Sequence, residues 1–331
     1  MQLALTVNCF QDEDLLMAQQ LGAQHIVAEA GGDILGGWDV ARLRAMRNRV
    51  EKAGLELVGI DALPPALYER AILGQPGRDE QITGVCLAIA HAGEAGIGLV
   101  GYGWTPAGLR RTTESVVGRG GARVAAYDHA LASPAPETGQ VAAEALWANL
   151  GYFLDRVIPA AQRAGVRLAC RPDDPPVSRQ GGAARILHDM EGLSRLFELA
   201  PSACHGLDFW QGTVAAMPGV DLLAAIRRFG AAKRILLVSV GNLQGTTAGF
   251  QEGFLDETPD TILHALQTYR AVGYAGPLRA VSPPMVEGDT PWGHKGRAHD
   301  LGYLRALLQV ISEHPPAGSE PEGGLPADPK V

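Results

Sequence analysis

The chain has 331 residues, of which 46% are hydrophobic and 19% are charged. This composition is typical of a globular protein with enough apolar material for a large core. The net charge of −8 is spread along the chain without runs of like charge, which argues against a nucleic acid or an anionic membrane as the partner. No apolar run reaches the length of a membrane span.

Four cysteines are widely spaced and include no C-x-x-C pair: Cys9, Cys86, Cys170 and Cys204. This spacing predicts reduced thiols and not a disulfide framework. The first residues, "MQLALTVNCFQDED", lack the pattern of a signal peptide. Together these features predict a cytoplasmic protein.

Short apolar runs alternate with longer amphipathic segments along the chain. The apolar runs predict strands at residues 2–7, 25–30, 55–60, 96–103, 166–170, 205–210, 234–240 and 276–282. The amphipathic segments predict helices at residues 11–21, 40–53, 78–94, 139–164, 185–199, 219–229, 260–272 and 298–313. Several of these helices end on a glycine just before the next strand, as in "KAGLELV" and "RAGVRLA", where a left-handed cap can turn the chain.

Eight strand–helix units predict an α/β fold with a parallel sheet, and eight is the number that closes a (β/α)8 barrel. A doubly wound open sheet is the rival, but no G-x-G-x-x-G follows the first strand. We therefore expect a single barrel over residues 1–313. Residues 105–138 form a long insertion after the fourth strand, which we expect to be a lid or a binding loop. Residues 314–331, rich in Pro, Gly and acidic residues, are expected to be a disordered tail.

In such a barrel the chemistry lies where strands run into the following loops. The polar and aromatic side chains at these points are Asn8, Asp61, Tyr102, Trp104, Arg171, Asp173, Asp174, Asp208, Trp210, Ser239, Asn242 and Ser282. The loop "RPDDPP", residues 171–176, is stiffened by its prolines and begins with an arginine. Such a rigid, charged loop at a strand end predicts a binding role.

Several motifs resemble those of the mannonate dehydratase family, barrels of the xylose-isomerase-like superfamily. They are "RDEQI", "RPDDPP", "GLDFWQGT", "NLQGT", "FQEGFLDE" and "GDTPWGH", and the resemblance runs from residue 1 to residue 313. It implies a lyase that dehydrates D-mannonate to a 2-keto-3-deoxy sugar acid. It also implies a divalent metal such as Mn or Mg, held by His, Cys, His and Asp.

The positions that match the family's four metal ligands are all substituted in this chain. They hold Arg171, Trp210, Ser239 and Val281. Of these four side chains only serine could ligate a metal, and it is a poor ligand. We therefore expect no metal cofactor at this site. A replacement metal site built from Asp173, Asp208, Asp289 and His294 is only an alternative, since nothing in the spacing of these residues demands it.

Arg171 has two compatible interpretations. It pairs with Asp173, Asp174 or Asp208 and fills the place of a cation, or it binds the carboxylate of a sugar acid through its planar guanidinium. In the second interpretation Asp173 or Asp174 orients the guanidinium, and the insertion brings Arg110, Arg111 or Arg123 nearby.

The remaining candidates also have a structural alternative. The candidates for proton transfer or orientation are Arg171, Asp173, Asp174, Asn242 and His294, and those for substrate binding are Asp208, Trp210, Ser239, Tyr102, Trp104, Arg123 and Trp292. Asp173 and Asp174 could cap the loop, Trp210 could be packing, Asn242 could satisfy a turn, and His294 could be an exposed loop histidine. His205, at a strand start, is expected to be structural.

Three functions follow. The first is a sugar-acid lyase of the parent class that works without a metal and is not an efficient D-mannonate dehydratase. The second is a metal-free isomerase or lyase acting on a keto-sugar. The third is a catalytically silent barrel that binds sugar acids or pairs with a metal-bearing paralogue. The expected partner is a small sugar acid or keto-sugar, with a homo-oligomer also considered.

Overall fold

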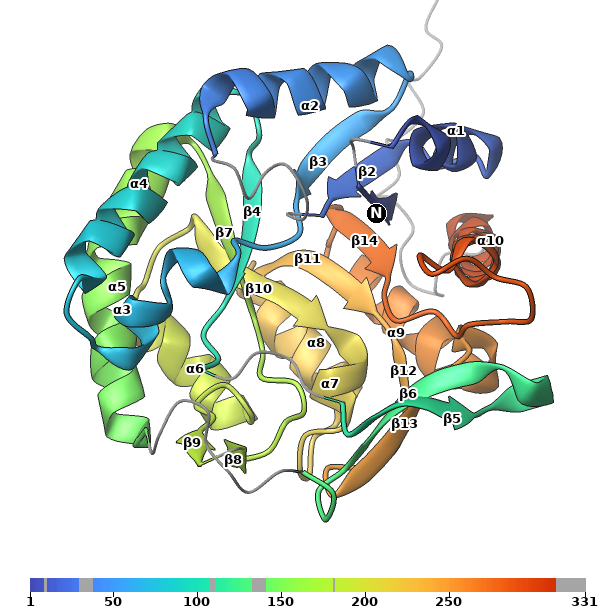
Figure 1. Ribbon diagram of the computed structural model, residues 1–331. Helices are drawn as coiled ribbons and strands as arrows, with labels where there is room; N and C mark the ends of the chain where they lie inside the picture. The colour runs from blue at the N-terminus through green and yellow to red at the C-terminus, as the bar shows by residue number, and fades with distance from the viewer. Residues whose placement is uncertain (9–10, 30–37, 107–110, 133–140, 181, 314–331) are drawn as a thin grey trace, which may run out of the picture.

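The computed structural model describes residues 1–8, 11–29, 38–106, 111–132, 141–180 and 182–313. Within this part of the chain, eight parallel strands close a barrel in the order β1-β14-β11-β10-β7-β4-β3-β2. Their bounds are β1 Gln2–Val7, β2 His25–Ala28, β3 Glu56–Ile60, β4 Leu99–Gly103, β7 Arg167–Arg171, β10 His205–Trp210, β11 Ile235–Val240 and β14 Pro277–Ala280. The predicted (β/α)8 barrel is confirmed (Figure 1).

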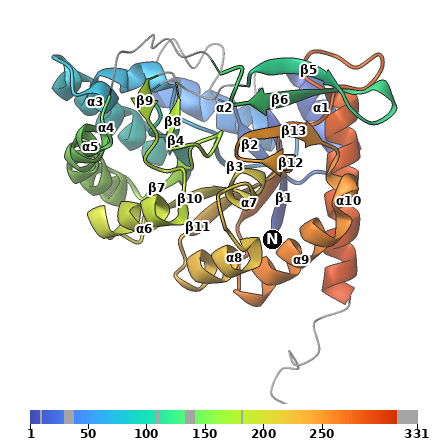
Figure 2. The ribbon, with the colours of Figure 1, turned by 90° about the horizontal axis from the view of Figure 1, so that it is seen from below.

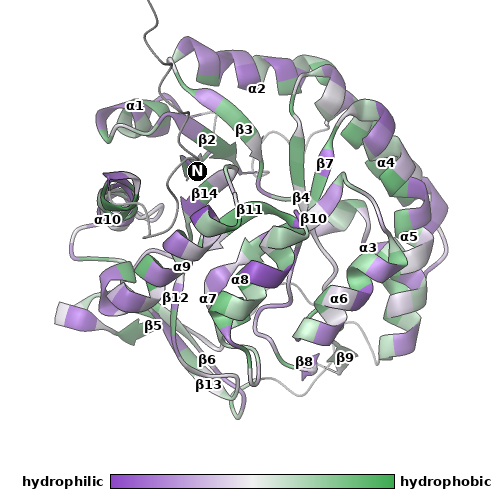
Figure 3. Cartoon of the chain, turned by 180° about the vertical axis from the view of Figure 1, so that it is seen from behind, coloured by the Kyte–Doolittle hydropathy of each residue, from purple (hydrophilic) through white to green (hydrophobic). Residues whose placement is uncertain are grey.

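Helices surround the barrel on its outer side (Figure 1). The main ones are α1 Asp12–Gln20, α2 Val40–Lys52, α4 Arg78–Glu94, α5 Ala143–Ala164, α6 Met190–Leu199, α8 Leu222–Ala231, α9 Pro259–Ala271 and α10 His294–Glu313. Each covers a strand with an apolar stripe, as Leu146, Leu150, Phe153 and Val157 do on α5. The outer helices are therefore amphipathic, and Figure 3 shows hydrophilic and hydrophobic residues mixed along them. None of the described helices is long and apolar enough to cross a membrane.

Strand alternation separates two apolar layers. One face of each strand packs against the helices in the main core, as Leu168 and Cys170 of β7 do. The other face points into the barrel, where Ala4, Val27, Leu99, Ala169, Leu236 and Leu237 form a separate cluster. The same alternation carries Arg171 to the interior at the end of β7, because it lies two residues beyond Ala169.

The insertion after β4 does not stand alone. Its described part holds β5 Thr113–Val117 and β6 Arg123–Asp128, joined by η3 Arg119–Gly121. These strands continue a hairpin that follows β11, made of β12 Asn242–Thr246 and β13 Gly249–Gly253, in an antiparallel sheet β12-β13-β6-β5. Figure 2 shows these strands together beside α10. The insertion is therefore a structured arm, where the sequence predicted only a loop.

Smaller elements lie in the loops that follow the strands. They are η2 Pro65–Leu67, α3 Glu69–Leu73, β8 Arg179–Gln180, β9 Ala183–Ala184, α7 Gln211–Ala215 and η4 Leu255–Glu257. The three cysteines in the described part, Cys86, Cys170 and Cys204, are unpaired as predicted, and Cys9 lies outside it. The predicted tail, residues 314–331, also lies outside the described residues.

Candidate functional site

Four charged side chains meet at the mouth of the barrel, where the strands end. Asp61 follows β3, Arg171 ends β7, Asp208 lies on β10 and Arg279 lies on β14. We call these four residues the double-arginine cluster. All four point inward because each has the interior register of its strand.

The two arginines of this cluster share the two carboxylates. Nη2 of Arg171 lies 2.9 Å from Oδ1 of Asp61 and 3.3 Å from Oδ2 of Asp208. Nη2 of Arg279 lies 3.3 Å from the same oxygen of Asp208 and also contacts Asp61. The cluster therefore holds two positive and two negative charges and is neutral as a unit.

Neighbouring side chains satisfy the remaining groups of Asp208 and Arg279. Ser239 donates to Oδ1 of Asp208 at 2.7 Å and accepts from Nε of Arg279 at 3.0 Å. The indole of Trp210 donates to Oδ2 of Asp208 at 2.9 Å, and its ring lies 4.5 Å from the guanidinium carbon of Arg171. Ser239 and Trp210 therefore stabilise the charged groups of the cluster by hydrogen bonds. Trp210 packs against Arg171 and also makes a polar contact with Asp208.

The opposite charges of the cluster favour the ionised forms of Asp61 and Arg171. Burial alone would raise the pKa of Asp61, but Arg171 and Arg279 outweigh it and hold that pKa well below its ordinary range. Burial would lower the pKa of Arg171, yet Asp61 and Asp208 raise it above its ordinary value. These groups therefore stay charged, and Asp61 is a weak base.

Asp173 and Asp174 do not orient Arg171, so that prediction is wrong. Both are fully buried, and Arg171 pairs instead with Asp61 and Asp208. Asp173 accepts from Thr105 at 2.5 Å and from the backbone N–H of Leu187 at 2.7 Å, and it pairs with Arg185 at 3.2 Å. Because both of its carboxylate oxygens bind neighbouring protein groups, Asp173 stabilises the loop.

A second charged group, which we call the Arg111 cluster, joins the insertion to the mouth. Arg111 lies 2.7 Å from Asp174 and 2.9 Å from Glu252, which is on β13. Burial raises the pKa of Glu252, with Arg111 opposing the shift and Asp174 adding to it. Ser282, at a left-handed φ of 55°, also hydrogen-bonds Glu252. One cation here faces two carboxylates, so this cluster has an excess negative charge.

The sequence analysis missed Arg279 and Glu252. Arg279 is a charged residue inside the last apolar run, "GPLRAVS", and Glu252 lies in "FQEGF". A charged side chain within a barrel strand was the signal that could have pointed to Arg279, because a lone buried charge needs a partner.

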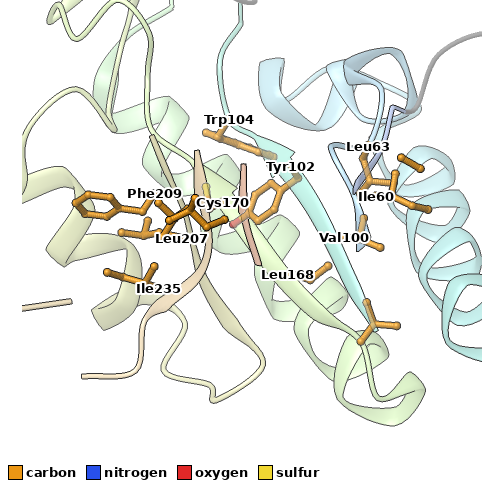
Figure 4. Packing of buried hydrophobic residues seen from close by; sticks show 14 of the residues in the cluster. Ile60, Leu63, Val100, Tyr102, Trp104, Leu168, Cys170, Leu207, Phe209 and Ile235 are labelled. Atoms are coloured by element: carbon orange, nitrogen blue, oxygen red, sulfur yellow. The ribbon is translucent and has the colours of Figure 1, made fainter. Parts of the chain in front are cut away.

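Tyr102 and Trp104 lie in the outer core and not at the mouth, so their predicted substrate contacts are not supported by their positions. Figure 4 shows both side chains among buried hydrophobic residues. Tyr102 bonds His205 at 2.8 Å, and Trp104 donates to the carbonyl of Leu146 at 3.2 Å. Burial lowers the pKa of His205 to about 4, which keeps it neutral. The structural interpretation of His205 agrees with this environment.

Two other candidates, Asn242 and Arg123, lie outside the double-arginine cluster. Asn242 donates to the carbonyl of Phe254 at 2.6 Å, which supports the hairpin. Arg123 is exposed on β6, and its role in substrate binding stays a prediction. Arg110 lies outside the described residues.

His294 is not a loop histidine but the first residue of α10. The helix begins earlier than predicted because Asp289 accepts from the backbone N–H groups of Lys295 and Gly296 at 2.9 and 3.1 Å. His294 lies 3.4 Å from Asp14, and its ring centroid is 4.7 Å from that of Trp292.

Two cavities adjoin the mouth. The smaller, of ≈ 10 Å³, has room for about one water molecule. It is lined by residues that include Arg111, Trp210, Ser239, Asn242, Val281 and Ser282. The larger, of ≈ 220 Å³, lies between the ends of β3, β4 and β7 and includes Arg171 in its wall.

The residues at the mouth do not fit a divalent metal. Two guanidinium groups already bind both carboxylates there, and Trp210 and Ser239 donate hydrogen bonds to Asp208. Within the described ranges no three His, Cys, Asp or Glu side chains come together as metal ligands. The alternative set of Asp173, Asp208, Asp289 and His294 is therefore not brought together.

Comparison with known proteins identifies the family of this chain. The family model for D-mannonate dehydratase (UxuA) matches residues 12–138 and 136–316. The chain belongs to the mannonate dehydratase family. It is 29% identical over 337 residues to mannonate dehydratase 2 of Halalkalibacterium halodurans, covering 92% of this chain and 95% of that relative.

Solved structures agree with the family. The crystal structure of mannonate dehydratase from Streptococcus suis serotype 2 superposes with a TM-score of 0.84 at 26% identity, covering 100% of this chain and 98% of that one. D-psicose 3-epimerase from Clostridium cellulolyticum H10 superposes with a TM-score of 0.61 at 10% identity, covering 95% of this chain and 99% of that one. The second likeness shows a shared fold, which the predicted xylose-isomerase-like barrel anticipated.

Proposed function

We propose that this member of the mannonate dehydratase family is a sugar-acid lyase that acts without a divalent metal and is not an efficient D-mannonate dehydratase. The observation that carries the proposal is the double-arginine cluster. Two guanidinium groups stand where a cation would otherwise balance Asp61 and Asp208. A guanidinium cannot be deprotonated to ligate a metal, so it excludes a bound ion by its charge and its volume.

The same cluster explains why the parent reaction should be slow. Removal of the proton next to a carboxylate places negative charge on the substrate, and an electrophile must stabilise that charge. Arg171 and Arg279 are already neutralised by their carboxylates, and guanidinium spreads its charge over a plane. They supply less stabilisation than a divalent ion would.

Arg171 retains the means to hold a substrate carboxylate. Its Nε and Nη2 bind Asp61 and Asp208, whereas Nη1 has no hydrogen-bond partner among the described residues. Arg171 also lines the larger cavity. Nη1 is therefore available for a charge-assisted bond to a carboxylate.

Glu252 is the most suitable group for proton transfer near the mouth. Its raised pKa makes it a better acid and base near neutral pH than Asp61, whose pKa is strongly lowered. Arg111, which spans from the insertion to Glu252, would keep the carboxyl in place.

The test combines metal analysis with an assay. Purified protein is dialysed, its metal content is measured, and it is incubated with D-mannonate while the 2-keto-3-deoxy acid is followed. The family member from Halalkalibacterium halodurans serves as the parallel control. We expect no stoichiometric metal and turnover far below about 1 s⁻¹, the low end of ordinary enzymes. One tightly bound ion per chain, or turnover at that rate or faster, would overturn the proposal.

A second candidate is a catalytically silent barrel that binds sugar acids. The observation that favours it is the neutral charge of the double-arginine cluster, since most donors of Arg171 and Arg279 are committed to Asp61, Asp208 and the hydroxyls of Ser239 and Thr6. Binding of a sugar acid by calorimetry, with no product formed from a panel of sugar acids and keto-sugars, would select it. Turnover of a keto-sugar would instead select the metal-free isomerase or lyase.

A further inference from the structure

The cavity of ≈ 220 Å³ beside Arg171 differs in character from a site built for a polyol. Its described lining residues are Ala62, Leu63, Pro65, Tyr68, Gly103, Thr105, Arg171 and Pro172. Four of these side chains are purely aliphatic. The cavity therefore has an apolar body with Arg171 as its charged group.

The other polar groups of the lining are already engaged. The hydroxyl of Tyr68 donates to the carbonyl of Gly103 at 3.0 Å and accepts from the N–H of Gly103 at 3.2 Å. The hydroxyl of Thr105 donates to Asp173 at 2.5 Å, which leaves it only as an acceptor. Nη1 of Arg171 is then the free donor in this wall, counting only the described residues.

These features restrict the ligand. A hexonic acid carries a hydroxyl on each carbon of its chain, and each buried hydroxyl that finds no partner weakens binding. An aliphatic chain matches Ala62, Leu63, Pro65 and Pro172 without that penalty. A carboxylate at one end matches Nη1 of Arg171.

Charge sets a second restriction. The double-arginine cluster is neutral, and the Arg111 cluster adds a negative charge at the same mouth. A monoanion gains the direct bond to Arg171, whereas a phosphate dianion meets no second free cation among the described side chains. The cavity should therefore discriminate against phosphorylated sugars.

We infer that this cavity is a binding site for a small monocarboxylate with an apolar or deoxygenated body, held by Nη1 of Arg171. The inference rests on the carboxylate recognition in the proposed function and narrows its substrate class. Within the acids of the proposed function it favours deoxygenated ones, which keep the carboxylate and carry few hydroxyl groups.

Isothermal titration calorimetry with four probes tests the ligand class. The probes are 4-methylpentanoate, its neutral amide 4-methylpentanamide, D-mannonate and 6-phospho-D-gluconate. We expect 4-methylpentanoate to bind at least about tenfold more tightly than each of the others, one charge-assisted bond or one unsatisfied hydroxyl being worth about that factor.

Variants test the location. Gly103 lines the cavity, and an added Cβ there meets no other atom within 4 Å, so the methyl of Gly103→Ala enters open space and Gly103→Val adds two further carbons beyond it. Both variants should bind 4-methylpentanoate more weakly than the wild type does, and Gly103→Val at least about tenfold more weakly. Gly302→Ala on α10, where the new methyl also meets nothing within 4 Å, is the matched control and should leave affinity unchanged. Arg171→Ala should abolish binding, and the glycine variants keep the test decisive if that protein does not fold.

The outcomes separate this inference from the proposed function. Tighter binding of D-mannonate than of 4-methylpentanoate would overturn the apolar ligand class while leaving metal-free sugar-acid recognition standing. Equal binding of the amide would overturn the carboxylate contact. Unchanged affinity in Gly103→Val, or no binding of any monocarboxylate, would overturn the site. A bound metal ion or rapid D-mannonate turnover would overturn the proposed function without reference to this cavity.

Discussion

The double-arginine cluster and the Arg111 cluster lie at the same end of the barrel but balance their charges differently. The first sets two arginines against two aspartates, and the second sets one arginine against two carboxylates. The pKa of Asp61 is lowered in the first, and that of Glu252 is raised in the second. Burial raises the pKa of both carboxyls; two arginines together outweigh it at Asp61, whereas the single Arg111 does not outweigh it at Glu252.

The largest expected effect comes from unbalancing the double-arginine cluster. Arg279→Met removes a cation that is only 2% exposed and leaves Asp208, which is fully buried, with one arginine fewer. We expect a loss of about 3–5 kcal/mol in the free energy of unfolding, the usual cost of breaking a buried ion pair. Urea denaturation measures it. Arg123→Met on exposed β6 is the control, and a loss below about 1 kcal/mol for Arg279→Met would show that the cluster is not strongly coupled.

A smaller effect should follow from removing a supporting hydrogen bond. Ser239→Ala deletes a hydroxyl that donates to Asp208 and accepts from Arg279. Bonds to charged groups contribute about 1.5–3 kcal/mol, and we expect a loss in that range by urea denaturation. The pair Ser239→Ala and Arg279→Met should be non-additive, because both act on Asp208. Strict additivity would contradict the shared network.

Asp61 should give the protein an acid-dependent part of its stability. Its folded pKa lies below the unfolded value, so its contribution is present above about pH 4 and is lost as the pH falls through the folded pKa. Between pH 4 and pH 2, wild type should lose about 1–2 kcal/mol more than Asp61→Asn, since this carboxyl is partly exposed and its effect is screened. Parallel stability curves for the two proteins would rule this out.

Glu252 should show the opposite sign and the smallest effect. Its folded pKa is above the unfolded value, so the stability linked to it is present below about pH 4.3 and is lost as the pH rises through the folded pKa. Glu252→Gln should therefore remove up to about 1 kcal/mol of destabilisation between pH 4 and pH 7. Thermal melts across this range check it, and a variant whose stability falls more steeply than wild type would contradict the assignment.

The strands and most helices could be predicted because their patterns are local. The apolar runs at 55–60 and 234–240 match β3 and β11 within a residue, since a buried parallel strand reads as a continuous apolar run. The arm could not be predicted in the same way. Phe250 of β13 pairs with Tyr127 of β6, and neither local sequence indicates a pairing strand so far away along the chain.

The candidate site was predicted in part. Arg171 and Asp208 were placed at the mouth from strand order alone, and their pairing was one of the two interpretations of the arginine. Arg279 was hidden because one charge inside "GPLRAVS" does not disturb an apolar pattern. Tyr102 was misplaced because strand ends alternate in direction, and Gly101 and Gly103 hold the interior register on β4.

The sheet β12-β13-β6-β5 has a consequence for engineering. It joins two excursions of the chain, one from β4 and one from β11, so each supplies the hydrogen-bonding edge that the other needs. A chimaera could carry the arm of another family member on this barrel without the matching hairpin. Such a protein would expose an unpaired strand edge, which promotes aggregation. The two segments form a single cassette, and recombination within the family should exchange them together.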